Sequence, residues 1–160
     1  MPQFSQRDLD YVIRLDEVMW GCLLVAVTLT IHGIGVFYAL RLSRRLTPRT
    51  RRRPSVDLGV ILLTAMMIVV LHLFEVMVWA GFFTWKNAQP NPFSAFYYAL
   101  LNYTTLAAGY LPLRWRLLEG LLAMAGLLSF AFSTSALIAL SRAMREEREK
   151  TERAPNPDSA

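Results

Sequence analysis

Three long apolar runs constrain the fold of this chain more than any other feature of its sequence. They cover residues 18–40, 56–84 and 115–140. Each has the length of a membrane-crossing helix, which takes about 20 mostly apolar residues and satisfies all of its own backbone polar groups. The second run closes on aromatic residues, which are enriched at membrane boundaries and are expected to form an outer belt: Trp79, Phe82, Phe83 and Trp85. The sequence therefore predicts an all-α membrane protein with three transmembrane helices.

The composition excludes several classes of function. The chain is 54% apolar and carries 17 Lys and Arg against 12 Asp and Glu, a net charge of +5. The basic residues cluster beside the predicted spans, where membrane topology explains them, so no nucleic acid partner is expected. The single Cys22 excludes a disulfide framework. Because the sequence holds neither a nucleotide-binding glycine loop nor a nucleophile paired with a base, we expect no enzyme activity and no cofactor.

Arginines in the predicted loop 41–55 determine the expected topology. They are Arg41, Arg44, Arg45, Arg49, Arg51, Arg52 and Arg53. Basic loops stay on the cytoplasmic side of a membrane, so this loop and the charged tail 142–160 are expected inside. The polar leader 1–17, which has the apolar spacing of a short interfacial helix, is expected outside. Binding of anionic lipid headgroups is the alternative role of these arginines.

A short helix is predicted between the second and third spans. Asn91 is a suitable N-cap and Pro92 a suitable first residue, and the helix should continue to about Tyr103. A dozen helical residues extend about 18 Å, well short of the roughly 30 Å hydrocarbon core. Helix 92–103 can therefore enter a membrane without crossing it, and the loop 104–113 must lead the chain back.

The residues that follow this helix carry a resemblance to a known family. Residues 104–110 read TTLAAGY, at the place where the filter of potassium channels reads TTVGYGD. Residues 56–141 resemble the pore domain of the potassium-channel superfamily, and more closely the small bacterial ion-channel-domain proteins with one extra N-terminal helix. The resemblance implies four copies around one axis in a bacterial inner or plasma membrane. Its parts would be an outer helix 56–84, a pore helix 92–103, a filter-like loop 104–113 and an inner helix 115–140.

The filter-like segment departs from the family's motif. Its residues are Thr104, Thr105, Leu106, Ala107, Ala108, Gly109 and Tyr110. In the family, backbone carbonyls replace the hydration shell of potassium, and glycines allow the dihedral angles that aim these carbonyls inward. The two threonines match, whereas Ala107 stands for the first glycine, Ala108 for the tyrosine and Tyr110 for the aspartate. With these departures, the resemblance implies a poorly selective monovalent cation channel, with potassium among its ions; the alternative is a non-conducting scaffold or partner subunit that retains the channel fold.

The third span carries small and hydroxylated residues in its middle. Gly126 corresponds to a hinge of the inner helix in the resemblance, and the hydroxyls of Ser129, Ser133 and Thr134 could line a wet pore. Ser and Thr in membrane helices also bond to their own helix or pack across an interface. Both interpretations of these hydroxyls remain open at the level of sequence.

Three ionisable residues lie at similar depth in the first two spans. His72 and Glu75 share one face of the second span, and His32 comes level with His72 if the two spans are antiparallel. Buried polar groups are costly in a membrane, so these three should face protein or water. Two imidazoles and a carboxylate can relay a proton or hold a metal. We favour a hydrogen-bonded clamp between helices and assign no metal ligand.

Overall fold

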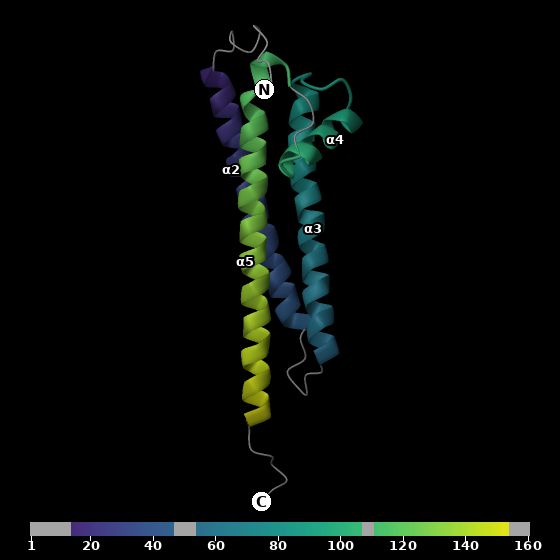
Figure 1. Cartoon of the computed structure of the whole chain (residues 1–160), viewed down its shortest axis with the longest axis vertical. Helices are drawn as coiled ribbons and strands as arrows, with labels where there is room; N and C mark the ends of the chain where they lie inside the picture. The colour runs from purple at the N-terminus through teal and green to yellow at the C-terminus, as the bar shows by residue number, and fades with distance from the viewer. Residues whose placement is uncertain (1–13, 47–53, 107–110, 154–160) are drawn as a thin grey trace, which may run out of the picture. The chain divides into compact units, whose positions relative to one another are not determined.

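The computed structural model describes residues 14–46, 54–106 and 111–153, and Figure 1 shows their helices. In chain order the elements are α2 (Leu15–Leu46), α3 (Pro54–Trp85), α4 (Pro92–Tyr103), the short 3-10 turn η1 (Leu113–Trp115) and α5 (Leu117–Arg153). These three described stretches contain no strand. The predicted all-α fold class is therefore confirmed. Parts of the predicted leader, arginine loop, filter-like segment and tail lie outside the described residues.

Three of these helices have the properties of membrane spans. Helices α2, α3 and α5 are each long and apolar enough to cross a membrane, as the sequence predicts. Only 28 to 33% of the residues in their most apolar windows are buried within the chain. The rest of this apolar surface faces outward, where lipid or another chain would have to cover it.

The long helices extend beyond the apolar runs. Helix α2 continues to Leu46, and its last turn contains Arg44 and Arg45. Arginine is a good helix former, and positive charge near a C-terminus complements the helix dipole. Helix α5 likewise begins at Leu117 and continues to Arg153, because its charged end also favours helix. The predicted loop 41–55 and inner helix 115–140 therefore differ from the observed helix ends.

Helices α2, α3 and α5 are each divided between two compact units, which are described separately. The first unit comprises Met1–Ile31 and Leu73–Ser129, and it contains α4 and η1. The second unit comprises His32–His72 and Phe130–Ala160. In the described residues of the second unit, all the regular structure belongs to the three long helices.

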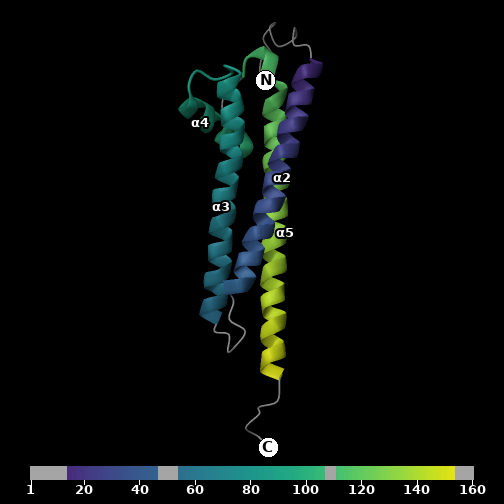
Figure 2. The same ribbon diagram turned by 180° about the vertical axis from the view of Figure 1, so that it is seen from behind.

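The core of the first unit is aromatic. Trp79 and Phe83 have no exposed surface, and the indole Nε1–H of Trp79 donates to the Thr28 hydroxyl at 2.9 Å. The Phe83 ring meets the Tyr98 ring edge-on, which packs α4 beside α3 (Figures 1 and 2). The expectation of a boundary belt is therefore wrong for Trp79, Phe82 and Phe83, which all belong to the buried core. Trp85, at the end of α3, is 61% exposed.

The interior of the second unit joins its helices through small hydroxyls and aliphatic side chains. The hydroxyls of Ser43 and Thr64 share a hydrogen bond of 2.5 Å, and each oxygen also lies 2.7 Å from a carbonyl oxygen of its own helix. The hydroxyl that donates across to the other helix cannot also donate to its own carbonyl. Val60, Leu140 and Met144 form an apolar cluster in this unit. Hydroxyl hydrogen bonds and aliphatic packing therefore both join helices in the second unit.

Candidate functional site

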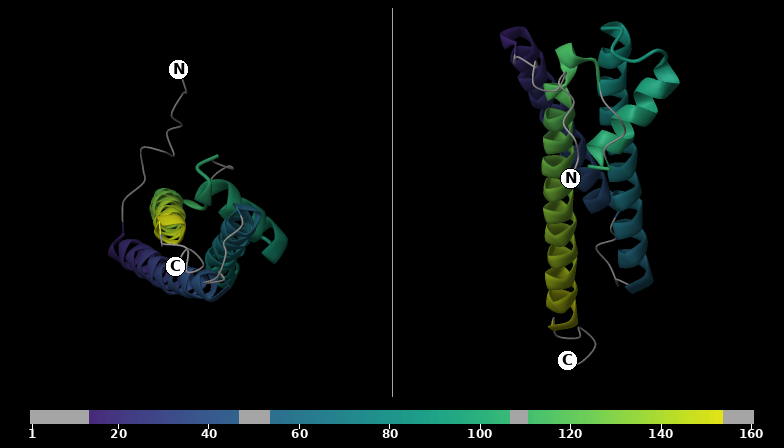
Figure 3. Two further views of the ribbon diagram at one scale, coloured as in Figure 1. Left: turned by 90° about the horizontal axis from the view of Figure 1, so that it is seen from below. Right: turned by 45° about the horizontal axis from the view of Figure 1, so that its top comes forward.

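Helix α4 and the chain that follows it form the most distinctive site of the first unit. The Asn91 side chain caps the helix by accepting a hydrogen bond from the Ser94 N–H at 2.9 Å, and Pro92 is the first helical residue. The helix ends at Tyr103, so its bounds coincide with those expected from the sequence. Figure 3 shows α4 inclined against the neighbouring part of α3.

A buried carboxylate holds the C-terminal end of α4. The hydroxyl of Tyr103 donates to Glu75 Oε2 at 2.5 Å, and both residues are almost fully buried. Burial and the Glu75 carboxylate raise the pKa of Tyr103 well above its usual range, so the hydroxyl keeps its proton and remains a donor. This contact fixes the end of α4 to α3.

A glycine of α5 receives the same end of α4. A Cβ atom added at Gly126 would collide with the carbonyl oxygen of Tyr103, so only glycine allows the two backbones to come this close. The observed role of Gly126 is therefore close packing. The hinge that the resemblance implies stays a prediction.

The position of this contact gives the depth that α4 reaches within the unit. Glu75 lies ten residues before the end of α3 at Trp85, which corresponds to about 15 Å along the helix. Gly126 lies nine residues after the start of α5, or about 13 Å along it. Helix α4 therefore starts near the end of α3 and finishes deep between α3 and α5.

The chain then returns to the starting end of α5. The Leu111 N–H donates to Glu119 Oε1 at 2.5 Å, and the Leu117 N–H donates to Glu17 Oε1 at 2.6 Å. Carboxylates accept strong hydrogen bonds from backbone donors that lack a helical partner. Glu119 thus ties down the returning segment, and Glu17 caps the first turn of α5.

A second tyrosine of α4 lies beside this returning segment. The Tyr98 hydroxyl is buried without a partner in hydrogen-bonding geometry. Burial and the nearby Glu119 carboxylate raise the pKa of Tyr98, so this phenol also keeps its proton. Glu119 is consequently neighbour to both the backbone of Leu111 and the phenol of Tyr98.

The first filter-like residues form the end of the helix. The Thr104 hydroxyl donates to the carbonyls of Leu100 and Leu101. Thr105 has a positive φ of 65°, and its N–H donates to the Asn102 carbonyl. With the bond from the Leu106 N–H to the Leu101 carbonyl, this is a Schellman motif in which threonine takes the place usually held by glycine. Leu106 is exposed, and Ala107, Ala108, Gly109 and Tyr110 lie outside the described residues.

The hydroxyls predicted on the inner helix divide between buried and exposed positions. Ser129 has no exposed surface and Ser133 is 5% exposed, whereas Thr134 is exposed and donates to the carbonyl of Phe130 in its own helix. Of the two roles expected for these hydroxyls, burial within the single chain favours packing between helices over contact with water for Ser129 and Ser133.

The predicted ionisable residues fall into the two units. In the second unit, Ser133 Oγ lies 3.1 Å from His32 Nε2 and 3.2 Å from His72 Nε2. The centroids of the two imidazole rings are 5.1 Å apart. Glu75 belongs to the first unit, where Tyr103 is its partner. A common cluster of all three residues stays a prediction.

Sequence reasoning missed three partners in these sites. For Ser133 the sequence left pore lining and helix packing open, and it did not indicate the contact with the two histidines. Tyr103 was treated as a packing residue and Glu17 as part of a polar leader, although each pairs with a group distant in sequence. The signal that could have indicated Glu17 is its position directly before an apolar run, because a carboxylate that becomes buried needs hydrogen-bond donors.

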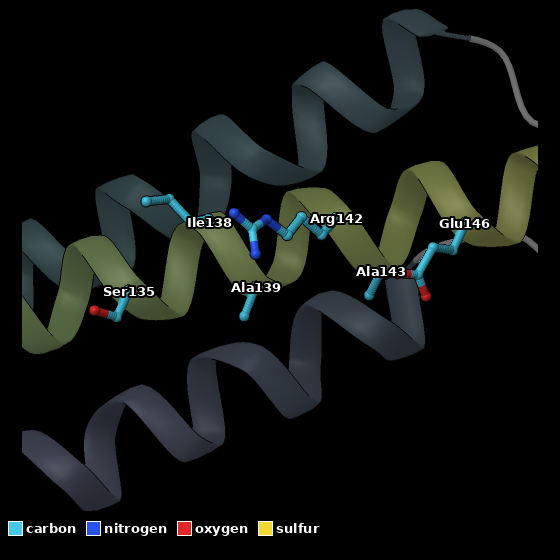
Figure 4. A pocket seen from close by; sticks show the side chains of 6 residues that line it. All are labelled: Ser135, Ile138, Ala139, Arg142, Ala143 and Glu146. Atoms are coloured by element: carbon cyan, nitrogen blue, oxygen red, sulfur yellow. The ribbon is translucent and has the colours of Figure 1, made fainter.

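The second unit also carries an open groove along α5 (Figure 4). Its volume is about 490 Å³, and it is lined by Ser135, Ile138, Ala139, Arg142, Ala143 and Glu146. Ser135, Ala139 and Ala143 recur every four residues, so they form a stripe of small side chains on this helix.

No protein-family model, curated protein or solved structure matches this chain. Its function is therefore inferred from its own residues and their geometry.

Proposed function

We propose that this chain is the pore-forming subunit of a homotetrameric cation channel with weak selectivity among monovalent cations. The observation that carries the proposal is the position of α4 and of Leu111: α4 descends about 15 Å between α3 and α5, and Leu111 bonds to Glu119 near the start of α5. In a membrane, this path would be a re-entrant loop that enters and leaves on the same side. Such loops deliver backbone groups to a pore.

The end of α4 suits a cation in two ways. The C-terminus of a helix carries partial negative charge, which favours cations near it. Irregular backbone at membrane depth is also tolerated only where protein or a water-filled cavity surrounds it, so the residues from Thr104 to Leu106 call for further chains around them. Four copies around one axis would supply both the enclosure and a shared cavity.

The outward faces of the helices favour assembly. The small residues Ser135, Ala139 and Ala143 leave α5 thin at the groove in Figure 4, and small residues allow membrane helices to approach closely. Two thirds or more of each most apolar window is also unburied in the single chain. A neighbouring copy could cover part of both surfaces.

Weak selectivity follows from the filter-like sequence. Ala107 and Ala108 lack the glycine and tyrosine that shape a potassium filter in the resembling family. Alanine at positive φ costs about 1 kcal/mol in each subunit, so a fixed ring of carbonyls at the radius of potassium is not favoured. We therefore expect potassium and sodium to pass at similar rates.

A second candidate function is a non-conducting scaffold or partner subunit with the same fold. The burial of Ser129 and Ser133 within one chain favours it, because these hydroxyls are then withdrawn from any cavity between copies. Thr134 and Ser135 are exposed, so their hydroxyls could still line the pore if the protein is a channel.

Flux through liposomes separates the two candidates. The purified protein, shown to be a tetramer by native mass spectrometry, should pass potassium and sodium at similar rates, with empty liposomes as the control. The triple variant Ala107→Gly, Ala108→Tyr and Tyr110→Asp should raise the preference for potassium. If the wild type and the triple variant are both tetrameric and both silent, the scaffold is correct.

Topology is tested independently of conduction. We propose a multi-pass protein of a bacterial inner or plasma membrane, with the arginine loop inside. After Cys22 is replaced by alanine, a cysteine at Asn87 should react with an impermeant thiol reagent in intact cells, and one at Thr50 should react only after lysis. Labelling of Thr50→Cys in intact cells would reverse the topology.

A further inference from the structure

Two imidazoles from different helices converge on one hydroxyl in the second unit. His32 on α2 and His72 on α3 each place Nε2 within 3.2 Å of Ser133 Oγ on α5. The exposed fractions of the three residues are 1%, 8% and 5%. The hydroxyl is therefore shared between the two rings in a nearly dry environment.

The chemistry of a hydroxyl makes the two histidines unequal. Ser133 Oγ has one proton to donate, so it can donate to only one of the two Nε2 atoms. The other Nε2 must carry a proton and donate to the oxygen. When the hydroxyl donates to one ring, that ring keeps Nε2 bare and the other ring keeps Nε2–H.

Ring packing favours His72 as the donor. Its ring lies 4.5 Å from that of Phe130 with an interplanar angle of 34°, so it sits over an aromatic face that attracts a cation. The ring of His32 meets Phe132 at 5.7 Å and nearly perpendicular. On α3, Glu75 follows His72 by three residues and belongs to the first unit.

The other charged and titratable groups lie far along the helices. On α2, Tyr38 and Arg41 follow His32 by six and nine residues, and on α5 Arg142 follows Ser133 by nine. Nine residues correspond to about 13 Å of helix, beyond the reach of a direct contact. On α3, Asp57 precedes His72 by fifteen residues.

A second proton on this pair would meet strong repulsion. Two positive rings with centroids 5.1 Å apart disfavour the doubly charged state by a factor of roughly 200, if the effective dielectric constant is about 20. The hydroxyl cannot relieve this repulsion, because it carries no charge. The pair is therefore suited to one added proton.

We infer that His32, Ser133 and His72 form a binding site for a single proton. The proton comes from water and binds to Nδ1 of His72, which already carries a proton on Nε2. The resulting imidazolium donates through Nε2–H to Ser133 Oγ, and Ser133 donates to the bare Nε2 of His32, which stays neutral. This ordered chain joins α2, α3 and α5, and the inference holds whether or not the protein conducts ions.

Nitrogen NMR of the wild-type protein tests the inference directly. The chain has only two histidines, so ¹⁵N-histidine labelling of the full chain in lipid nanodiscs gives two ring systems. Between pH 8 and pH 5, the range in which histidine normally changes charge, one ring should become an imidazolium. The other should keep the pattern of a neutral ring with a bare Nε2.

Variants assign the two rings and test the role of the hydroxyl. In His72→Gln, the ring that becomes an imidazolium should be lost, which assigns the charged ring to His72. In Ser133→Ala, His32 should lose its fixed tautomer. Thr134→Ala is the matched control, because the neighbouring hydroxyl bonds to its own helix and should leave both rings unchanged.

Three results would overturn the inference. The first is that neither wild-type ring changes its charge between pH 8 and pH 5, in which case the three residues only hold the helices together. The second is that both rings become imidazolium together. The third is that the ring which charges is that of His32. The wild-type titration requires no substitution, so it remains decisive even if a variant fails to fold.

Discussion

The two units of the molecule bury different kinds of polar group. In the first unit, the carboxylates of Glu17, Glu75 and Glu119 accept hydrogen bonds from two backbone N–H groups and one tyrosine. In the second, neutral hydroxyls and imidazoles meet one another. The first unit contains chain that leaves the helices, whose free N–H groups need strong acceptors. The second unit links continuous helices, whose backbone is already satisfied.

This contrast separates two tasks. A buried carboxylate is expensive, so Glu75 and Glu17 are kept where they hold the end of α4 and the start of α5, and the half-buried Glu119 holds the returning segment. Burial of a neutral hydrogen-bonded pair costs less free energy than burial of a charge, and such pairs suffice to align helices that are already formed. Loss of a contact in the first unit should therefore lower the free energy of unfolding more than loss of a comparable contact in the second. Pairs of substitutions, one in each unit, test this expectation.

The largest change in stability is expected where a glycine lies against a neighbouring segment of the chain. Gly126→Ala should lower the free energy of unfolding by about 2 to 3 kcal/mol, because the new methyl group meets the backbone of Tyr103. Gly35→Ala in the second unit should cost less than about 1 kcal/mol, since it meets only the movable side chain of Leu71. Gly120→Ala, in open space on α5, is the control and should be neutral or stabilising. Unfolding by SDS in mixed micelles measures all three, and equal costs at Gly126 and Gly35 would remove the contrast.

The next effect is expected where a tyrosine meets a carboxylate. Tyr103→Phe removes the hydroxyl that donates to the buried Glu75 and should destabilise the protein by about 2 kcal/mol. Ser133→Ala removes a hydroxyl between neutral groups and should cost about 1 kcal/mol. Tyr97→Phe changes an exposed phenol of the same helix and serves as the control. A larger loss for Ser133→Ala than for Tyr103→Phe would contradict the proposed division of tasks.

A somewhat smaller effect is expected at the returning segment. Glu119→Gln keeps a side-chain oxygen but loses its charge, so the bond from the Leu111 N–H should weaken by about 1 to 1.5 kcal/mol. Hydrogen exchange of the Leu111 amide should become faster in this variant. Glu147→Gln, on the exposed charged end of α5, should leave that amide unchanged. Unaltered exchange in Glu119→Gln would show that the carboxylate does not hold the segment.

The smallest effect is a gain in stability. Thr105 is exposed and has a positive φ, which is unfavourable for a β-branched residue, so Thr105→Gly should stabilise the protein by about 1 kcal/mol. Thr104→Gly is the contrasting variant, because it removes a hydroxyl that bonds to two carbonyls of α4. The same SDS titration compares them. A loss of stability in Thr105→Gly would indicate that this side chain has partners in the assembled protein.

Local pattern was sufficient for much of the fold. Apolar length predicted three helices able to cross a membrane, and the pair Asn91 and Pro92 marked where α4 begins. These features depend on residues close together in sequence, through helix propensity, capping and the transfer of apolar side chains out of water. The apolar runs did not predict the helix ends, because charged residues beyond them continue the helices to Leu46 and Arg153.

The partners of the buried polar groups were decided only by tertiary structure. Periodicity placed His72 and Glu75 on one face of a helix, but it could not show that Ser133 would bridge the histidines or that Tyr103 would donate to Glu75. The same holds for Trp79, which a boundary pattern placed at the membrane surface and which the core encloses against Thr28. The physical reason is that a hydrogen bond between helices depends on their rotation and separation, and these follow from the packing of all side chains at once. Sequence determines which groups need partners, and packing decides which partner each one meets.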